Sequence, residues 1–149
     1  YGVPLIINAR LDVALESGAD GVHVGIEDAP VSEIRRQAGP DFIIGATAKT
    51  VAQARAAQSA GADYLGVGAV FPSPTKRNAI RITSEVLREI CGSVSIPAVA
   101  IGGITAENAP SLRGCGMAGI AVVAAIFGAS HIPPAAPGVR TPAESITAP

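Results

Sequence analysis

Short apolar segments alternate with helix-like segments along most of the chain, and this alternation restricts the fold more than any other feature. The apolar segments are rich in Val, Ile, Ala and Gly, which is typical of strands buried in a parallel sheet. The predicted strands are residues 4–8, 21–25, 42–47, 64–68, 98–102 and 119–124. The predicted helices between them are residues 11–17, 31–38, 50–60, 84–91 and 106–114. Strands alternating with helices of this length predict βαβ units and an α/β fold with a parallel sheet.

A short repeat marks the step from helix to strand. Gly-Ala-Asp occurs at residues 18–20 and again at 61–63, and Gly-Met-Ala stands at the corresponding place, residues 116–118. Glycine is the usual residue just past the C-terminus of a helix, because it adopts a left-handed backbone without steric cost. The repeat therefore supports the boundary between helix and strand at three places.

Polar or glycine residues follow nearly every predicted strand, as expected for a (β/α)8 barrel, in which the loops after the strands meet at one face. No Gly-x-Gly-x-x-Gly follows the first strand, which disfavours a dinucleotide-binding sheet. The spacing of strands and helices by itself distinguishes a barrel from an open doubly wound sheet only weakly. We predict an incomplete TIM (β/α)8-type barrel of about six βα units. Because a complete barrel has two more strands, the simplest expectation is that the first two strands are missing.

The chain has 149 residues, enough for one domain with a hydrophobic core. Residues 1–130 are expected to form the partial barrel. Residues 131–149 are rich in Pro and Ala without clear periodicity, so we expect a disordered tail or a linker there.

Composition excludes several classes of protein. The formal net charge of -1 gives no field to attract nucleic acid or anionic lipid. No apolar run reaches the roughly 20 residues that a membrane-spanning helix needs. Cys91 and Cys115 lack the Cys-x-x-Cys spacing of metal and redox sites, so we expect buried thiols in a reducing cytosol.

The loop after the fourth predicted strand carries the strongest chemical signal. Ser73, Thr75 and Lys76 place two hydroxyls and one ammonium directly beyond that strand, and the neighbouring prolines donate no amide hydrogen. Hydroxyls and an ammonium suit a phosphate, so we predict an anion site at Lys76; a solvated loop lysine beside Arg77 is the plainer alternative.

The loop after the fifth predicted strand fits the same role. Gly102 and Gly103 allow close backbone approach, and Thr105 is positioned to cap a helix with Asn108 three residues later. A helix start after bare glycines suits an anion, although a plain tight turn uses the same residues. The backbone amides of residues 123–124, after the next strand, would complete the predicted anion-binding site.

Carboxylates and other polar groups follow the remaining strands. Glu27 and Asp28, facing a phosphate site, suggest Mg2+ held jointly with a diphosphate, although surface acids that bind no metal are commonplace. Asn8 and Thr47 end the first and third strands, where each could hydrogen-bond a ligand or form a turn. His23 lies within an apolar strand and is expected to be a packed histidine rather than a catalytic base.

Together, these segments resemble the thiamine phosphate synthase (thiamine-phosphate pyrophosphorylase) family over about residues 2–128. The matching segments are PLIINARLDVAL, GADGVHVGIED, IIGATAKT, GADYLGVGAVFPSPTKRN, IPAVAIGGITAEN and GIAVVAAIFG. The resemblance implies a cytoplasmic TIM barrel that acts as a transferase in thiamine biosynthesis. Its small-molecule substrates would be 4-amino-5-hydroxymethyl-2-methylpyrimidine diphosphate and a thiazole phosphate, and its products thiamine phosphate and diphosphate.

The resemblance also implies a role for each matching position. Asn8 and Thr47, the latter at a family serine position, would contact the pyrimidine diphosphate, and Asp28 would bind Mg2+. Lys76 would hold the diphosphate as the catalytic residue. The thiazole phosphate would be bound by Ser73, Thr75, Gly103, Val123 and Ala124.

Several positions depart from the family pattern. Ala9 replaces an aspartate that binds Mg2+, and Ile26 replaces a glutamine. A Gln-x-Arg-x-Lys segment that grips the pyrimidine diphosphate is absent along with the first two strands. An inactive remnant of the family that binds a phosphate ester is therefore one alternative. A thiazole tautomerase is another, although Lys49 stands where its acid-base histidine is usual. A homo-oligomer or a fusion to another thiamine-pathway domain is compatible with all three.

Overall fold

The computed structural model of the chain describes residues 2–72, 80–128 and 132–147. Its strands are β1 (Ile6–Asn8), β2 (Gly21–Val24), β3 (Ile43–Ala48), β4 (Tyr64–Gly68), β5 (Ala98–Ile101) and β6 (Gly119–Ala121). Its α-helices are α1 (Leu11–Glu16), α2 (Val31–Ala38), α3 (Val51–Ser59), α4 (Ser84–Gly92), α5 (Ala124–Phe127) and α6 (Ile132–Thr147), and η1 (Ala109–Leu112) is a 3-10 helix.

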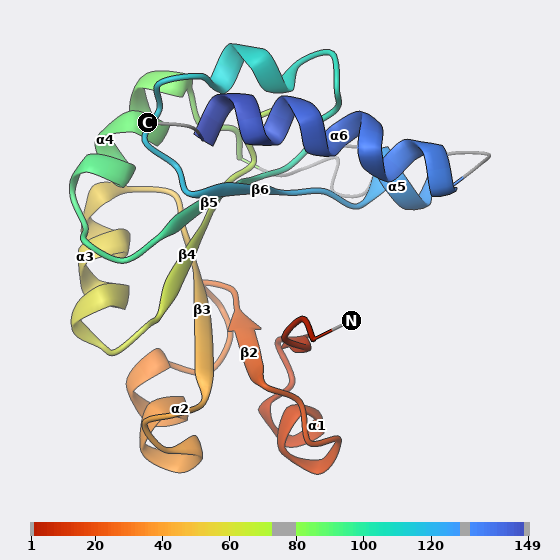
Figure 1. The fold of residues 1–149 in the computed structure, drawn as a ribbon. Coiled ribbons are helices and arrows are strands. Elements are labelled where there is room, and N and C mark those ends of the chain that lie inside the picture. The colour runs from red at the N-terminus through yellow and green to blue at the C-terminus, as the bar shows by residue number, and fades with distance from the viewer. Residues whose placement is uncertain (1, 73–79, 129–131, 148–149) are drawn as a thin grey trace.

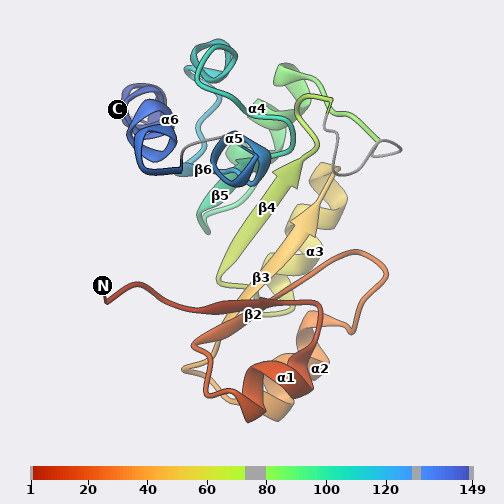
Figure 2. The same cartoon turned by 90° about the vertical axis from the view of Figure 1, so that its right-hand side faces the viewer.

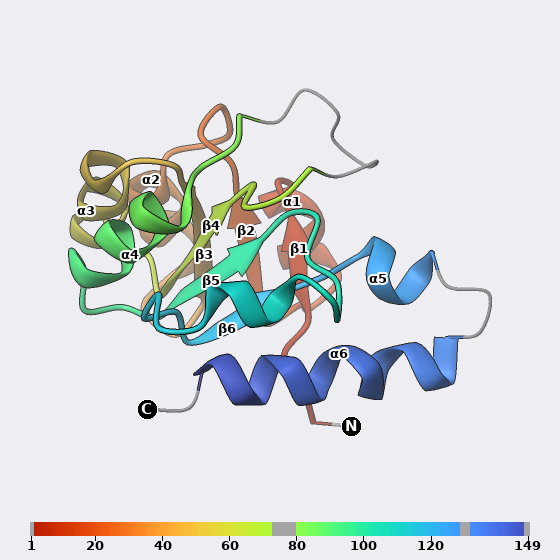
Figure 3. The ribbon, with the colours of Figure 1, turned by 90° about the horizontal axis from the view of Figure 1, so that it is seen from above.

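The six strands form one parallel sheet in chain order, β1 to β6 (Figure 1 for β2 to β6, Figure 3 for β1). Figure 2 shows the strands turning progressively from β2 to β4, which is the twist of a curved sheet. Within the described part of the chain, β1 and β6 do not pair with each other, so the sheet stays open. The predicted α/β class and incomplete TIM-type barrel are confirmed.

Helices and a hydrophobic core cover one face of the sheet. Because side chains alternate along a strand, every second residue points toward this face. Val22, Ile44, Leu65, Val67 and Ala100 lie there, each fully buried. Figures 1 and 3 show α2, α3 and α4 gathered beside the sheet on this side. The intervening residues point to the opposite, concave face, which in a barrel is the interior.

The aspartates of the Gly-Ala-Asp repeat have the same structural task. Asp20 Oδ2 accepts a hydrogen bond from the Leu5 amide at 2.7 Å, and Asp63 Oδ2 accepts one from the Ile44 amide at 2.7 Å. Each carboxylate therefore pairs an amide at or just before the start of the preceding strand, at the edge where the strands begin. The third repeat ends in Ala118, which has no carboxylate and keeps only the backbone bond, from its amide to the Ala98 carbonyl, that Asp20 and Asp63 make as well.

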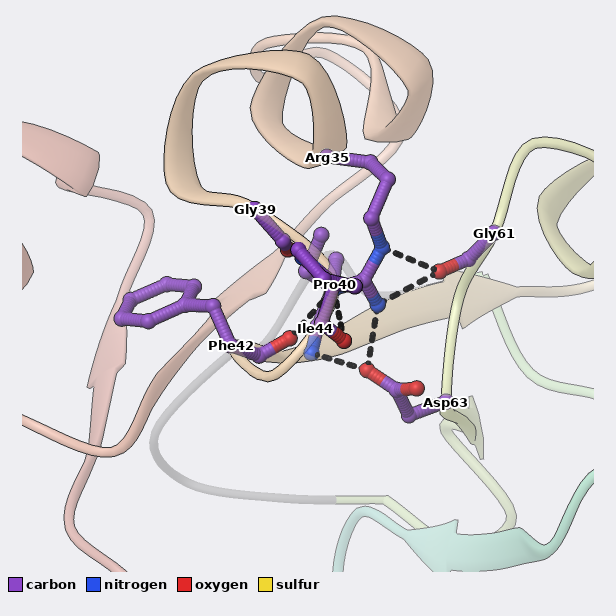
Figure 4. Close-up of polar contacts among 7 residues, drawn as sticks. All are labelled: Arg35, Gly39, Pro40, Phe42, Ile44, Gly61 and Asp63. Atoms are coloured by element: carbon purple, nitrogen blue, oxygen red, sulfur yellow. Dashed lines mark hydrogen bonds and ion pairs between the residues drawn. The ribbon is translucent and has the colours of Figure 1, made fainter.

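Arg35 closes the same edge (Figure 4). From α2, its guanidinium donates to the Phe42 carbonyl at 2.6 Å and to the Gly61 carbonyl at 2.8 Å. It also pairs with the Asp63 carboxylate at 2.7 Å. One side chain thus joins the end of α2, the start of β3 and the approach to β4.

Two predicted elements differ in extent. The helix predicted over residues 106–114 is only the 3-10 helix η1, because Pro110 would be the fifth residue of that helix and has no amide hydrogen to donate to the Ala106 carbonyl. The strand predicted to reach residue 124 ends at Ala121, and α5 follows from Ala124.

The expectation of an irregular tail was wrong for residues 132–147, which form α6. Val139 and Ile146, seven residues apart, are buried at 6% and 4% exposure, so one face of the helix packs against the fold. Figure 3 shows α6 running beside β6 and close to α5. The Pro-rich composition hid this spacing, although α6 accommodates Pro137 and Pro142.

Both cysteines carry free thiols: Cys115 is buried and Cys91 is half-buried. Burial raises the pKa of the Cys91 thiol to about 11, so it stays protonated at neutral pH.

In the described ranges, no helix combines the length and apolar character needed to cross a bilayer.

Candidate functional site

The carboxyl ends of the strands bring the predicted ligand-binding residues to one edge of the sheet. Asn8 is the last residue of β1, and Thr47 is next to last in β3. Asp28 lies in the loop after β2, while Val123 and Ala124 stand where α5 begins after β6. Since all six strands are parallel and adjacent in order, these positions share an edge, as predicted.

The predicted phosphate loop is only partly described. Ser73, Thr75 and Lys76 lie outside the described residues. The segment leading to them packs on the β5 loop, where the Phe71 amide donates to the Gly102 carbonyl at 3.0 Å.

Gly102 and Gly103 are needed for this close packing of the two loops. A Cβ atom at position 102 would lie 2.6 Å from Ala69 Cβ, and one at position 103 would lie 2.8 Å from the Phe71 carbonyl oxygen. Both glycines also have positive φ, at 100° and 61°. The glycines therefore serve loop-on-loop packing first, a use that the sequence did not reveal.

Thr105 and Asn108 make the reciprocal hydrogen bonds of the predicted cap, but they enclose a turn, because the helix that follows, η1, begins at Ala109 and not near Ala106. The Thr105 amide donates to Asn108 Oδ1 at 2.8 Å, and the Asn108 amide donates to Thr105 Oγ1 at 3.4 Å. Asn108 Nδ2 also donates to the Gly103 carbonyl at 2.9 Å, which ties the glycine turn to the cap. The backbone around Gly103 is thus held from both sides.

A polar cluster lies on the concave face, directly below the edge. His23 Nδ1 is 3.0 Å from Tyr64 Oη, and His23 Nε2 is 3.1 Å from Thr47 Oγ1. All three side chains are half-buried. His23 is packed, in agreement with the sequence prediction, but Tyr64 was not anticipated. The signal was the pair of strand glycines, Gly45 and Gly66, which leave room for two rings.

The acidic groups fit Mg2+ only in part. Asp28 is exposed, and its Oδ2 accepts a hydrogen bond from the Gly25 amide at 2.7 Å. In residues 2–72, 80–128 and 132–147, no three His, Cys, Asp or Glu side chains gather as a metal site would require. Mg2+ often binds proteins through one or two carboxylates and takes its other ligands from substrate phosphates. The donor set therefore suits a metal shared with a diphosphate rather than a resident ion.

A separate hollow of about 310 Å³ lies between the turn after β5 and the helices α5 and α6. It is lined by Thr105, Ala106, Glu107, Ala125, Gly138 and Val139. None of the predicted site residues lines it. Thr105, which the sequence singled out for a cap and not for a ligand, is the one residue that links this hollow to the predicted loops.

Comparison with known proteins places this architecture in a family. The family model described as thiamine monophosphate synthase matches residues 1–126. Thiamine-phosphate synthase 2 of Streptococcus pneumoniae is 52% identical over 132 residues, covering 89% of this chain and 63% of that protein. Thiamine-phosphate synthase of Pyrococcus abyssi is 46% identical over 146 residues, covering 98% and 70%. The chain thus spans less than two thirds of the length of the first of these relatives.

A solved structure agrees with the sequence comparisons. Thiamine phosphate pyrophosphorylase from Pyrococcus furiosus superposes with a TM-score of 0.87 at 41% identity, covering 96% of this chain and 68% of that one. Because the match covers 96% of this chain, it must include part of the 16-residue helix α6. The superposition therefore extends beyond the predicted barrel domain, residues 1–130. With its six ordered parallel strands and these matches, the chain belongs to the thiamine monophosphate synthase family.

Proposed function

We propose that the chain contributes to thiamine phosphate synthesis, joining a pyrimidine diphosphate to a thiazole phosphate with release of diphosphate. The observation that supports this most is the gathering of Asn8, Asp28, Thr47 and the Gly103 turn at one edge of a sheet from this family. We further propose a cytoplasmic location, as for a biosynthetic enzyme of small molecules.

The proposed chemistry asks for charge neutralisation and positioning. The bond between the pyrimidine methylene carbon and the diphosphate oxygen breaks, and the diphosphate leaves with the electron pair. The resulting cation is stabilised by the pyrimidine ring, and the thiazole nitrogen attacks it to form the new carbon–nitrogen bond. No general base is required, so the protein acts by holding both phosphates and orienting the two rings.

Each residue has a proposed part in this arrangement. Lys76 neutralises the leaving diphosphate, and the Thr47 hydroxyl and Asn8 amide bind the pyrimidine diphosphate. The Gly103 turn, with the backbone at Val123 and Ala124, receives the thiazole phosphate, together with the hydroxyls of Ser73 and Thr75. The cap formed by Thr105 and Asn108 supports this proposal, because it fixes the turn before a ligand arrives.

Mg2+ is the proposed cofactor, with Asp28 as its protein ligand. The ion would add positive charge beside the leaving diphosphate. Ala9 offers no carboxylate in the neighbouring loop, so Asp28 would share the metal chiefly with phosphate oxygens. Affinity for free Mg2+ is then expected to be low.

The test is formation of thiamine phosphate by the purified chain with both substrates and Mg2+. The Lys76→Ala variant should lose about 100-fold or more in rate, because it removes a charge that stabilises the leaving group. Arg81→Ala, which removes an equal charge from an exposed position, is the matched control and should retain the wild-type rate. Equal rates in both variants would argue against the proposed role of Lys76.

A second candidate is an inactive member of the family that binds a phosphate ester. Ala9 favours it, because only one of the two expected Mg2+ carboxylates is present. Calorimetric titration with thiazole phosphate tests it: binding without turnover would support this candidate over the enzyme. Turnover by the wild-type chain would exclude it.

A further inference from the structure

His23, Tyr64 and Thr47 meet on the concave face because of strand register. His23 pairs with Gly45 across β2 and β3, and Gly45 pairs with Tyr64 across β3 and β4. Val22 and Val24, on either side of His23, point to the buried core, so the imidazole points the other way. Gly45 has no side chain, so the rings of His23 and Tyr64, on the strands to either side, can approach each other over its backbone.

Glycines on two strands make room for the imidazole. A Cβ atom at position 45 would overlap both the Tyr64 ring and His23 Nδ1. A Cβ atom at position 66 would lie 2.8 Å from His23 Cε1. The ring therefore lies against bare backbone on β3 and β4, in a place that a larger residue at either position would fill.

The imidazole links a half-buried phenol to the hydroxyl at the edge. Burial raises the pKa of Tyr64, so its hydroxyl remains a donor over the physiological range. A neutral imidazole carries one donor and one acceptor nitrogen. If Tyr64 donates to Nδ1, then Nε2 carries the hydrogen and donates to Thr47 Oγ1. The Thr47 hydroxyl hydrogen is then left to donate to a third group.

We propose that His23 is a positioning residue, which orients the Thr47 hydroxyl so that it donates to the diphosphate of the substrate. The inference rests on the proposed function, because it assumes that Thr47 contacts this anion. In the opposite tautomer, Thr47 would donate to Nε2 and turn oxygen lone pairs toward the anion, which is repulsive. With Tyr64 as the donor to Nδ1, His23 takes the tautomer that suits an anionic ligand, and Tyr64 acts through His23 rather than on the substrate.

The tautomer can be measured without activity. Long-range proton–nitrogen NMR spectra of the labelled chain distinguish a protonated Nε2 from a protonated Nδ1. The chain has two histidines, and loss of signals in His23→Gln assigns those of His23. We expect the Nε2-protonated tautomer in the wild type and a mixture of both in Tyr64→Phe. A wild-type His23 protonated on Nδ1 alone would overturn the proposal.

A double-mutant cycle tests the coupling to substrate. His23→Gln and Thr47→Val should each raise the KM for the pyrimidine diphosphate about tenfold, as expected for one lost hydrogen bond to a charged group. The KM for thiazole phosphate should stay within about twofold, because that site lies on other loops. In the Thr47→Val background, His23→Gln should add less than about twofold. Thr47→Ser, which keeps the hydroxyl, should restore the full effect of His23→Gln.

A merely structural cluster gives a different pattern. The two effects would then multiply, and both KM values would change together; this result would overturn the inference while leaving the proposed function standing. Thermal melts of each variant identify any loss of folded protein. If the wild type forms no product, the same cycle is run by calorimetry with inorganic diphosphate and Mg2+. Coupled binding without turnover would retain the inference and reject the enzyme, whereas no binding would overturn both.

Discussion

Two Arg–Asp ion pairs lie at opposite edges of the sheet, and they differ in their exposure to solvent and in how far apart their residues lie in the chain. Arg35 and Asp63 meet at the edge where the strands begin, with side chains 21% and 47% exposed. Arg10 and Asp12 follow β1 at the opposite edge and are 66% and 56% exposed. The first pair joins residues 28 positions apart in the chain, and the second joins residues two apart.

The difference shows how the two edges divide stability from binding. Arg35 also donates to backbone carbonyls of three neighbouring segments, so that edge is closed by contacts within the chain. At the other edge, within the part of the chain that the structure describes, the Asp28 carboxylate bonds one nearby amide, and Asn8 is exposed. In barrels of this type, the edge where strands end carries the chemistry and the edge where they begin carries stability. Substitutions at the two edges should therefore separate folding from activity.

The largest effect on stability is expected from Arg35→Gln. The substitution removes the ion pair and leaves the Phe42 and Gly61 carbonyls without their partner, so the free energy of unfolding should fall by about 2–3 kcal/mol. Urea denaturation measures the loss. Arg36→Gln, on the exposed face of the same helix, is the matched control and should change stability little. Equal losses in the two variants would mean that charge on α2, and not the contacts in Figure 4, matters.

Gly45→Ala should have the next largest effect. The new methyl group would overlap both rings of the concave-face cluster, so we expect a loss of about 1–3 kcal/mol in unfolding free energy. Product formation should fall as well, because a displaced His23 would lose its hydrogen bond with Thr47. Gly119→Ala is the control: a Cβ atom on that β6 glycine meets no other atom within 4 Å. If Gly45→Ala were as stable as Gly119→Ala, the cluster would be loosely packed.

The sequence predicted the strand-and-helix order because its signals are local. β4 and α2 have the predicted bounds, since Pro30 and Gly39 flank α2 and Gly68 ends β4. Asn8 and Thr47 were assigned to one edge because parallel strands must end together. Tyr64 was missed because its meeting with His23 depends on the register Gly45–Tyr64, which is set by packing between strands. The tail was misjudged because proline content outweighed a single pair of apolar residues.

Position 9 should give a smaller change in stability and a separate change in activity. Ala9 has φ 65°, a left-handed conformation that costs alanine roughly 1–2 kcal/mol and that glycine adopts freely. Allowing for the greater entropy of an unfolded glycine, Ala9→Gly should stabilise the chain by about 0.5–1 kcal/mol. Ala9→Asp should be less stabilising, but it restores a carboxylate beside the Asp28 loop. Mg2+-dependent turnover should rise in Ala9→Asp and not in Ala9→Gly, and thermal melts with initial rates separate the two effects.

The smallest effect is expected at the exposed pair, where Arg10 Nε donates to Asp12 Oδ1 at 2.8 Å. The Arg10 guanidinium lowers the pKa of Asp12 from 3.8 to about 2. Any stabilisation is therefore present above pH 3.8 and is lost as the pH falls toward 2. At neutral pH, Arg10→Gln should leave the denaturation midpoint unchanged, because solvent screens exposed pairs. In NMR titration, the same variant should return the pKa of Asp12 toward its ordinary value. A loss as large as that of Arg35→Gln would show that the edge where the strands end also holds the fold together.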